Sequence, residues 1–268
     1  MSFIEFLKLC LIGLIQGITE PLPISSSAHM IILGNYLNLS NDLNFEIIIN
    51  FSSTLAIIIF FRKKIFHFIK NVITNNPKKY SDFNRTFFIK LIVASIPTMI
   101  VGFLLKDVID KYFMNIPFVS IALIITSIIN FCTYLFLSRK KIFTDEISYF
   151  DALTMGLMQS IALLPGISRS GSTVFGGTSR NVSIEKAFDF SFFLYLIASL
   201  GAFMLSLFDL DFKTLNISTI LVPFIICFIS TFFSIKWFYG KLNKKTLLLF
   251  SIYTFLVGTF FLLTCAIA

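Results

Sequence analysis

Two short polar stretches interrupt a chain that is otherwise strongly apolar, and both carry residues suited to phosphate chemistry. The first, TEPLPISSSAHM at 19–30, offers Glu20, Ser25, Ser26, Ser27 and His29. The second, LPGISRSGST at 164–173, offers Ser168, Arg169, Ser170, Ser172 and Thr173. A new helix is expected to begin within each stretch, and the free N–H groups at a helix N-terminus attract anions. Hydroxyls, one arginine and two helix N-termini together predict an anion site, most naturally for phosphate.

These residues also have structural alternatives. A serine that follows a proline is often only a helix cap. Arg169 has a structural alternative too, a salt bridge with Glu20 or Glu46, because an arginine at membrane depth needs an anionic partner. Both alternatives stay open at the level of the sequence.

The composition predicts a membrane protein. The chain has 268 residues, of which 56% are hydrophobic and 35 are phenylalanine, and its mean hydropathy is +0.88. Runs of about 18 or more apolar residues are typical of membrane-spanning helices. Six such runs are present, at residues 45–61, 87–105, 117–137, 187–208, 219–238 and 247–267. We therefore expect an all-α integral membrane protein that forms a single domain over residues 1–268.

The formal net charge of +8 indicates membrane topology rather than nucleic-acid binding. Three connections, 62–85, 138–150 and 236–246, hold fourteen lysines and arginines, whereas the alternate connections hold three and are richer in aspartate. This asymmetry follows the positive-inside rule, so the basic connections are predicted to be cytoplasmic. Lys78 should then be cytoplasmic, and Asp209 and both termini should face outward.

The two polar stretches belong to an internal repeat. Residues 13–28 and 156–171 align without a gap at an offset of 143, and seven of the sixteen positions are identical. The same offset pairs Gln16 with Gln159, and Ser26 with Arg169. A chance match of two apolar segments would not keep its register through polar positions. The sequence therefore predicts two repeats, at about 1–140 and 145–268.

The order of membrane crossings predicts that the repeat is inverted. The run at 45–61 must end inside and the run at 187–208 must start inside, so segment 151–180 has to return to the side it came from. Each half is then a re-entrant helical hairpin followed by three transmembrane helices, and the two halves have opposite orientations. Pro21 and Pro23 break the first short helix where the hairpin tip is expected. Broken backbone at membrane depth is tolerated where it is buried in protein or lines a wet cavity.

These motifs give the chain a specific resemblance to a known family. The stretches QGITEPLPISSSAH and LPGISRSGST, with FEIIIN, ASIPTMIVGF and AFDFSFFL in the expected order, resemble the undecaprenyl-diphosphate phosphatase family, also called the bacitracin-resistance protein family. The resemblance runs the length of the chain. It implies a multi-pass enzyme of the bacterial cytoplasmic (inner) membrane, with its active site facing the outer side. The implied reaction removes the terminal phosphate of undecaprenyl diphosphate, which recycles the lipid carrier for cell-wall precursor synthesis and confers bacitracin resistance.

The resemblance also implies roles for individual residues. Carried over by position, the catalytic residues are Glu20, Ser26, His29 and Arg169. Around them we expect the substrate-binding residues Ser25, Ser27, Ser168, Ser170, Thr173 and Gln16. A divalent metal, Mg²⁺ or Ca²⁺, is associated with the family, and Glu20 is its candidate ligand. Gln16 stands where some members have a second glutamate, which weakens the expectation of a strongly bound metal.

Two mechanisms and two functions stay open. In one mechanism Ser26 attacks the phosphate and either His29 or Glu20 takes its proton, since a hydroxyl nucleophile needs an adjacent base. In the other His29 attacks directly and Ser26 only binds phosphate. The competing function is a membrane carrier for a phosphorylated polyprenyl lipid, because inverted repeats with broken helices also bind transported anions. The expected partners are a polyprenyl diphosphate lipid and the membrane, not nucleic acid, and a homodimer is a candidate assembly.

Overall fold

The computed structural model describes residues 2–39, 43–74, 83–139, 142–208 and 217–267, and within these ranges the regular elements are ten helices. They are α1 (Phe3–Thr19), α2 (Ser26–Tyr36), α3 (Leu43–Thr74), α4 (Arg85–Tyr112), α5 (Ile116–Arg139), α6 (Tyr149–Ile161), α7 (Arg169–Ser179), α8 (Ile184–Ser206), α9 (Ile217–Gly240) and α10 (Lys244–Ile267). Six of them, α3, α4, α5, α8, α9 and α10, are long and apolar enough to cross a membrane. The prediction of an all-α protein with six membrane spans in these regions is confirmed at this level.

Some long helices continue past the ends that hydropathy predicted. The sequence placed a connection from residue 62 onward, whereas α3 continues to Thr74 and carries Arg62 and Lys70 on its last turns. Hydropathy marks only the apolar part of a helix. Lysine and arginine are good helix formers, so a helix can continue through them until a helix-breaking residue follows. Lys78 and Asp209, for which the sequence predicts opposite sides of the membrane, lie outside the described residues.

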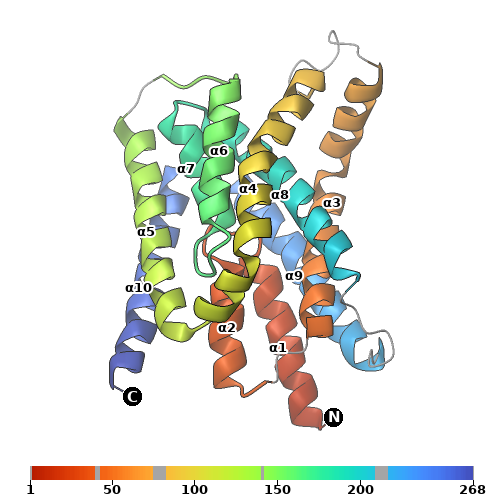
Figure 1. The fold of residues 1–268 in the computed structure, drawn as a ribbon, viewed down its shortest axis with the longest axis vertical. Coiled ribbons are helices and arrows are strands. Elements are labelled where there is room, and N and C mark those ends of the chain that lie inside the picture. Colours follow the sequence, from red (N-terminus) through yellow and green to blue (C-terminus); the bar gives the residue numbers. More distant parts are fainter. Residues whose placement is uncertain (1, 40–42, 75–82, 140–141, 209–216, 268) are drawn as a thin grey trace.

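Two short helical hairpins enter the molecule from opposite ends (Figure 1). The α1–α2 hairpin comes from the end where α1 begins and α10 ends, and its turn lies near the middle of the molecule. The α6–α7 hairpin comes from the other end, and its turn also reaches the middle. The two turns meet there, where the Ser170 hydroxyl donates to the Leu22 carbonyl oxygen at 3.4 Å.

Local sequence accounts for where the hairpin helices begin and end. Each first helix starts with a capping box, formed by Ser2 with Glu5 before α1 and by Ser148 with Asp151 before α6. Such reciprocal bonds satisfy N–H groups that a helix start leaves free. The turn after α6 uses Gly166, whose φ of +99° disfavours other residues and whose absent Cβ would lie 2.5 Å from the Cβ of Ala122. Both the backbone conformation and the lack of space therefore require glycine at this position of the turn.

The repeat partners Gly13 and Gly156 occupy equivalent helix crossings. A Cβ at Gly13 would lie 2.6 Å from the carbonyl oxygen of Pro223 in α9, and one at Gly156 would lie 2.1 Å from that of Ala94 in α4. These residues let α1 pack closely on α9 and α6 on α4. Small residues at such crossings are typical of helices that pack in a membrane.

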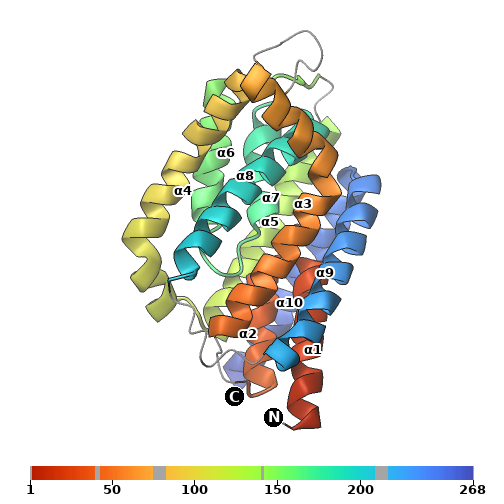
Figure 2. The same ribbon diagram turned by 90° about the vertical axis from the view of Figure 1, so that its right-hand side faces the viewer.

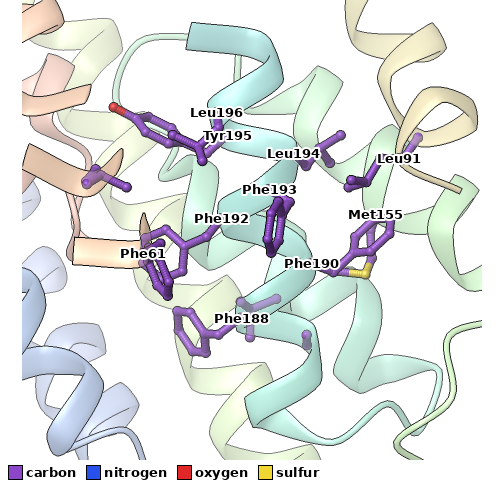
Figure 3. Packing of buried hydrophobic residues seen from close by; sticks show 14 of the residues in the cluster. Phe61, Leu91, Met155, Phe188, Phe190, Phe192, Phe193, Leu194, Tyr195 and Leu196 are labelled. Carbon is purple, nitrogen blue, oxygen red and sulfur yellow. The ribbon is translucent and has the colours of Figure 1, made fainter. Parts of the chain in front are cut away.

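Helix α8 lies at the centre of the largest apolar cluster. It passes between α3 and α4 and packs against both of them (Figure 2). The buried residues that it contributes are Ala187, Phe188, Phe190, Phe192, Phe193, Leu194, Tyr195 and Leu196. Several of them pack against Phe61, Leu91 and Met155 of neighbouring helices (Figure 3). Because so many of its side chains are enclosed, α8 is a rigid support for residues that reach the site.

Candidate active site

A cavity of about 670 Å³ is lined by both hairpin turns and by residues of the surrounding helices. Its polar lining includes Gln16, Glu20, Ser25, Ser26, Ser27, Asn50, Ser168, Arg169 and Ser170. Its apolar lining includes Ile12, Met30, Phe45, Ile49, Phe192 and Phe203. Pockets that combine a few polar groups with apolar walls suit ligands that are themselves amphipathic. The prediction that the two polar stretches come together is confirmed by this lining.

Glu20 is the centre of a hydrogen-bond network at the first turn. Its Oε2 accepts from the Ser26 hydroxyl, and from Gln16 Nε2 at 3.0 Å. Its Oε1 accepts from Arg169 Nη2 at 2.6 Å. The Gln16 amide also donates to Asn50 Oδ1 at 2.8 Å. A carboxylate that accepts from a serine hydroxyl is placed to take its proton, and the arginine balances its buried charge.

The N-termini of α2 and α7 differ in how they are capped. Ser168 caps α7 in the usual way, since its Oγ accepts from the Gly171 N–H at 3.2 Å. Ser25, the N-cap of α2, makes no such side-chain bond, and its Oγ lies 3.1 Å from Ser27 Oγ instead. Its φ of 66° lies in the left-handed region, which a non-glycine residue adopts only under local constraint. The cap alternative is therefore confirmed for Ser168, whereas no side-chain cap covers the first N–H groups of α2, which starts at Ser26.

Both ring nitrogens of His29 contact partners other than the Ser26 hydroxyl. Its Nδ1 lies 2.8 Å from the Ser25 carbonyl oxygen, and its Nε2 lies 2.7 Å from the Tyr253 hydroxyl. The His29 and Tyr253 rings are parallel to within 1°. Because Ser26 donates to Glu20 and both ring nitrogens of His29 are engaged elsewhere, the geometry favours Glu20 as the base for Ser26.

Arg169, the first residue of α7, forms a salt bridge with Glu20, which was one of the two partners in its structural alternative. The salt bridge leaves part of the Arg169 side chain accessible, since 33% of that side chain is exposed. Its Nη1 donates to Ser199 Oγ at 3.1 Å, and its guanidinium carbon lies 4.1 Å from the centroid of the Tyr195 ring. A guanidinium carries more N–H donors than these two hydrogen bonds use. Pairing with Glu20 and binding of a phosphate are therefore compatible.

The remaining predicted binding residues divide into two groups. Those that line the cavity are Gln16, Ser25, Ser27, Ser168 and Ser170. Thr173 is fully buried, and its hydroxyl is bonded to the Arg169 carbonyl oxygen at 2.9 Å and to the Ser191 hydroxyl. In this structure Thr173 therefore ties α7 to α8 behind the cavity.

Three residues of the site had no signal in the sequence. Tyr195 and Ser199 of α8 contact Arg169, and Tyr253 of α10 contacts His29. Each lies in a long apolar run, and although Tyr195 directly follows the stretch AFDFSFFL, nothing in the sequence connects these residues with Arg169 or His29. An aromatic or hydroxyl residue in such a run is read as core packing unless the neighbouring helix is known.

The donors at the cavity do not fit a divalent metal held by the protein. Within the part of the chain that the structure describes, no three His, Cys, Asp or Glu side chains gather to form a metal site. Both oxygens of Glu20 are engaged, one of them by the cationic Arg169. Mg²⁺ and Ca²⁺ prefer oxygen ligands with net negative charge, and an adjacent guanidinium opposes their binding. Elsewhere Asp189 is paired with Lys64 at 2.6 Å.

Comparison with known proteins gives matches over nearly the whole chain. A family model described as Bacitracin resistance protein BacA matches residues 9–260. The chain is 38% identical over 266 residues to a Bacillus thuringiensis (strain Al Hakam) protein named Undecaprenyl-diphosphatase 2, with 96% of this chain and 97% of that protein covered. It is 36% identical over 268 residues to Undecaprenyl-diphosphatase 1 of Bacillus licheniformis, with the same coverage. It is 35% identical over 269 residues to the Undecaprenyl-diphosphatase of Acholeplasma laidlawii, with 95% of each chain covered.

The region matched by the family model contains both hairpin turns and every residue named above as lining the cavity. A match of this extent, together with relatives above 30% identity along nearly the whole chain, identifies the family. The chain belongs to the family described as Bacitracin resistance protein BacA.

Proposed function

We propose that this chain hydrolyses the terminal phosphate of undecaprenyl diphosphate and releases undecaprenyl phosphate and inorganic phosphate. The observation that carries the proposal is the chain of contacts from the Ser26 hydroxyl through Glu20 to Arg169, inside a cavity with apolar walls. The names of the relatives support the same reaction. The product is the lipid carrier for cell-wall precursor synthesis, and its recycling agrees with the bacitracin resistance in the family's description.

Ser26 is the proposed nucleophile. Its Oγ attacks the terminal phosphorus while Glu20 Oε2 accepts the hydroxyl proton, and undecaprenyl phosphate leaves. This step forms a phosphoserine. The departing undecaprenyl phosphate takes the hydroxyl proton from Glu20. A water molecule then attacks the phosphorus of the phosphoserine, and Glu20 accepts one proton from that water. Glu20 passes this proton to the Ser26 oxygen as inorganic phosphate departs.

The charge of the transferred phosphoryl group is balanced by Arg169 and by the start of α2. Phosphoryl transfer depends mainly on positioning and on electrostatic stabilisation. Arg169 has N–H donors left after its contacts with Glu20 and Ser199. The first N–H groups of α2 add the positive end of a helix dipole, which no side-chain cap covers. The lipid tail would lie along the apolar lining of the same cavity.

We also propose that the hairpins are re-entrant and that the chain is a single membrane domain built from inverted repeats, at about 1–140 and 145–268. The helix packing supports this proposal. If each helix of α1–α5 is exchanged for its counterpart in α6–α10, the contact between α1 and α9 becomes the contact between α6 and α4. The same exchange maps the α3–α8 contact and the α5–α10 contact onto themselves. This is the pattern that a twofold axis between the halves produces. Cavity-lining polar residues come from both turns, so the site needs no second copy of the chain, and a homodimer stays a prediction.

The active site is proposed to open to the outer side of the bacterial cytoplasmic membrane. The basic helix ends at the start of α4, the end of α5 and the start of α10 lie at the end of the molecule from which the α6–α7 hairpin enters (Figure 1), and this end is therefore assigned to the cytoplasm. The test uses two exposed positions, Asn115 between α4 and α5, and Lys241 between α9 and α10. The background has the four native cysteines replaced: Cys10, Cys132, Cys227 and Cys265. With a membrane-impermeant maleimide on intact cells, Asn115→Cys should be labelled and Lys241→Cys should not. Permeabilised cells should label both, and the reverse pattern in intact cells would contradict the proposed orientation.

The proposed activity is tested by phosphate release from undecaprenyl diphosphate with the purified protein in detergent, titrated with Mg²⁺ and with Ca²⁺. We propose that a divalent cation reaches the site bound to the substrate's diphosphate, since no metal site is formed by His, Cys, Asp or Glu side chains among the described residues. The cation requirement should then follow the substrate concentration rather than the protein concentration. A protein that binds the lipid diphosphate but releases no phosphate would contradict the proposed phosphatase activity and favour the carrier function.

A further inference from the structure

Arg169 is held by more than its ion pair, because two of its partners come from α8. Tyr195 and Ser199 are four residues apart, so they lie on the same face of that helix. The Tyr195 ring lies under the guanidinium at 4.1 Å, and Ser199 Oγ accepts from Nη1 at 3.1 Å. Glu20 accepts from Nη2 at 2.6 Å. The guanidinium plane is therefore defined by one face contact and two edge contacts.

Tyr195 is itself fixed at both ends. The residue is 7% exposed and belongs to the apolar cluster around α8. Figure 3 shows it at one edge of the cluster, with the hydroxyl directed away from the phenylalanines. That hydroxyl lies 3.0 Å from Thr54 Oγ1 of α3. A ring anchored by packing on one side and by a hydrogen bond on the other cannot swing away from Arg169 without breaking one of them.

The type of contact matters for the reaction. An aromatic face attracts a guanidinium without accepting a hydrogen bond, so Tyr195 holds Arg169 without using any of its N–H donors. In the described part of the chain, the side-chain hydrogen bonds of Arg169 go to Glu20 and Ser199 alone. The other N–H donors stay free for an anion in the cavity. A long side chain that is 33% exposed would otherwise lose rotamer entropy when it binds the substrate.

We propose that Tyr195 and Ser199 are positioning residues of the phosphate site, which set the plane of the Arg169 guanidinium before the lipid diphosphate arrives. The inference rests on the proposed function for its substrate. Both residues act through Arg169 rather than on the reacting atoms, so their effects should disappear when Arg169 is removed. This dependence separates a positioning role from a purely structural one.

The test measures binding of a methylene-bridged analogue of farnesyl diphosphate, which keeps the diphosphate charge and cannot be hydrolysed, together with kcat and KM on undecaprenyl diphosphate. Tyr195→Leu should weaken analogue binding about tenfold and lower kcat/KM by about tenfold or more, as loss of a desolvated cation–π contact predicts. Tyr195→Phe keeps the ring and should stay within about threefold of the native protein. In an Arg169→Ala background, Tyr195→Leu should change analogue binding by less than about twofold.

Phe188→Leu is the matched control, since it removes a buried aromatic ring from the same helix at a position that does not line the cavity. At equal thermal stability it should leave analogue binding unchanged. If Tyr195→Leu does not fold, Ser199→Ala carries the test, with binding about threefold weaker in the native background and unchanged in Arg169→Ala. Equal losses in both backgrounds, or a Tyr195→Leu protein that binds like the native one, would overturn the inference. Analogue binding is measured without turnover. A protein that fails to release phosphate would therefore disprove the proposed function, while the binding results would still test the positioning role of Tyr195 and Ser199.

Discussion

Ser26→Ala is expected to lower phosphate release by about a thousandfold or more while lipid binding stays within a few fold of the native protein. The hydroxyl is the group that would form the bond to phosphorus, and it donates to Glu20 in the resting site. Its loss leaves Arg169 and the start of α2 in place to hold the diphosphate. The measurement is phosphate release from undecaprenyl diphosphate, paired with binding of the non-hydrolysable analogue.

The control for loss of a hydroxyl is Ser95→Ala. Ser95 is a buried serine of α4 that donates to the Leu91 carbonyl oxygen and does not line the cavity. Its loss should leave turnover near the native value. Adding Glu20→Gln to Ser26→Ala should cost little more turnover, because residues that act as one unit lose most activity with the first change.

The same experiment distinguishes the two candidate nucleophiles. In the structure the ring nitrogens of His29 are engaged by Ser25 and Tyr253 rather than by Ser26. We therefore expect His29→Ala to be less damaging than Ser26→Ala. A Ser26→Ala protein with substantial turnover, together with a His29→Ala protein that has none, would show that the histidine attacks phosphorus and that the serine only binds it.

Arg169→Lys should fail nearly as badly as Arg169→Ala, with a loss of about a hundredfold or more in kcat/KM. The guanidinium bonds to Glu20 and Ser199 at once and also stacks on Tyr195. A lysine ammonium is a compact point charge that cannot make these contacts and also present a flat edge of donors to a phosphate. The measurement is steady-state kinetics on undecaprenyl diphosphate for both variants, with analogue binding alongside.

Arg180→Lys is the matched control, because Arg180 at the end of α7 also pairs with a carboxylate, Asp151 at 2.9 Å, and stacks on Phe150. It lies outside the cavity lining, so its replacement should leave kcat/KM near the native value. Near-normal turnover in Arg169→Lys would show that only the positive charge is needed there, and that the shape of the guanidinium does not matter.

Much of the fold follows from local properties of the chain. The apolar runs predict the six long helices because membrane-spanning helices must keep their surface apolar over a set length. Helix α1 ends at Thr19, shortly before Pro21 and Pro23, because proline lacks the N–H that a continuing helix would need. The 143-residue offset aligns Ser26 with Arg169, and these residues do begin α2 and α7. These features can be recognised within one segment or by aligning two segments of the chain, so the sequence alone determined them.

The contacts of the site were decided by the tertiary structure. Glu20 serves Ser26 as well as Arg169, a sharing that neither motif predicts by itself. Tyr195 and Tyr253 became site residues only when α8 and α10 packed beside the hairpin turns. In the sequence both lie in apolar runs, where nothing connects them with Arg169 or His29. The physical reason is that helix propensity and hydropathy act along one segment, whereas the meeting of side chains from different helices depends on how the helices rotate and pack against each other.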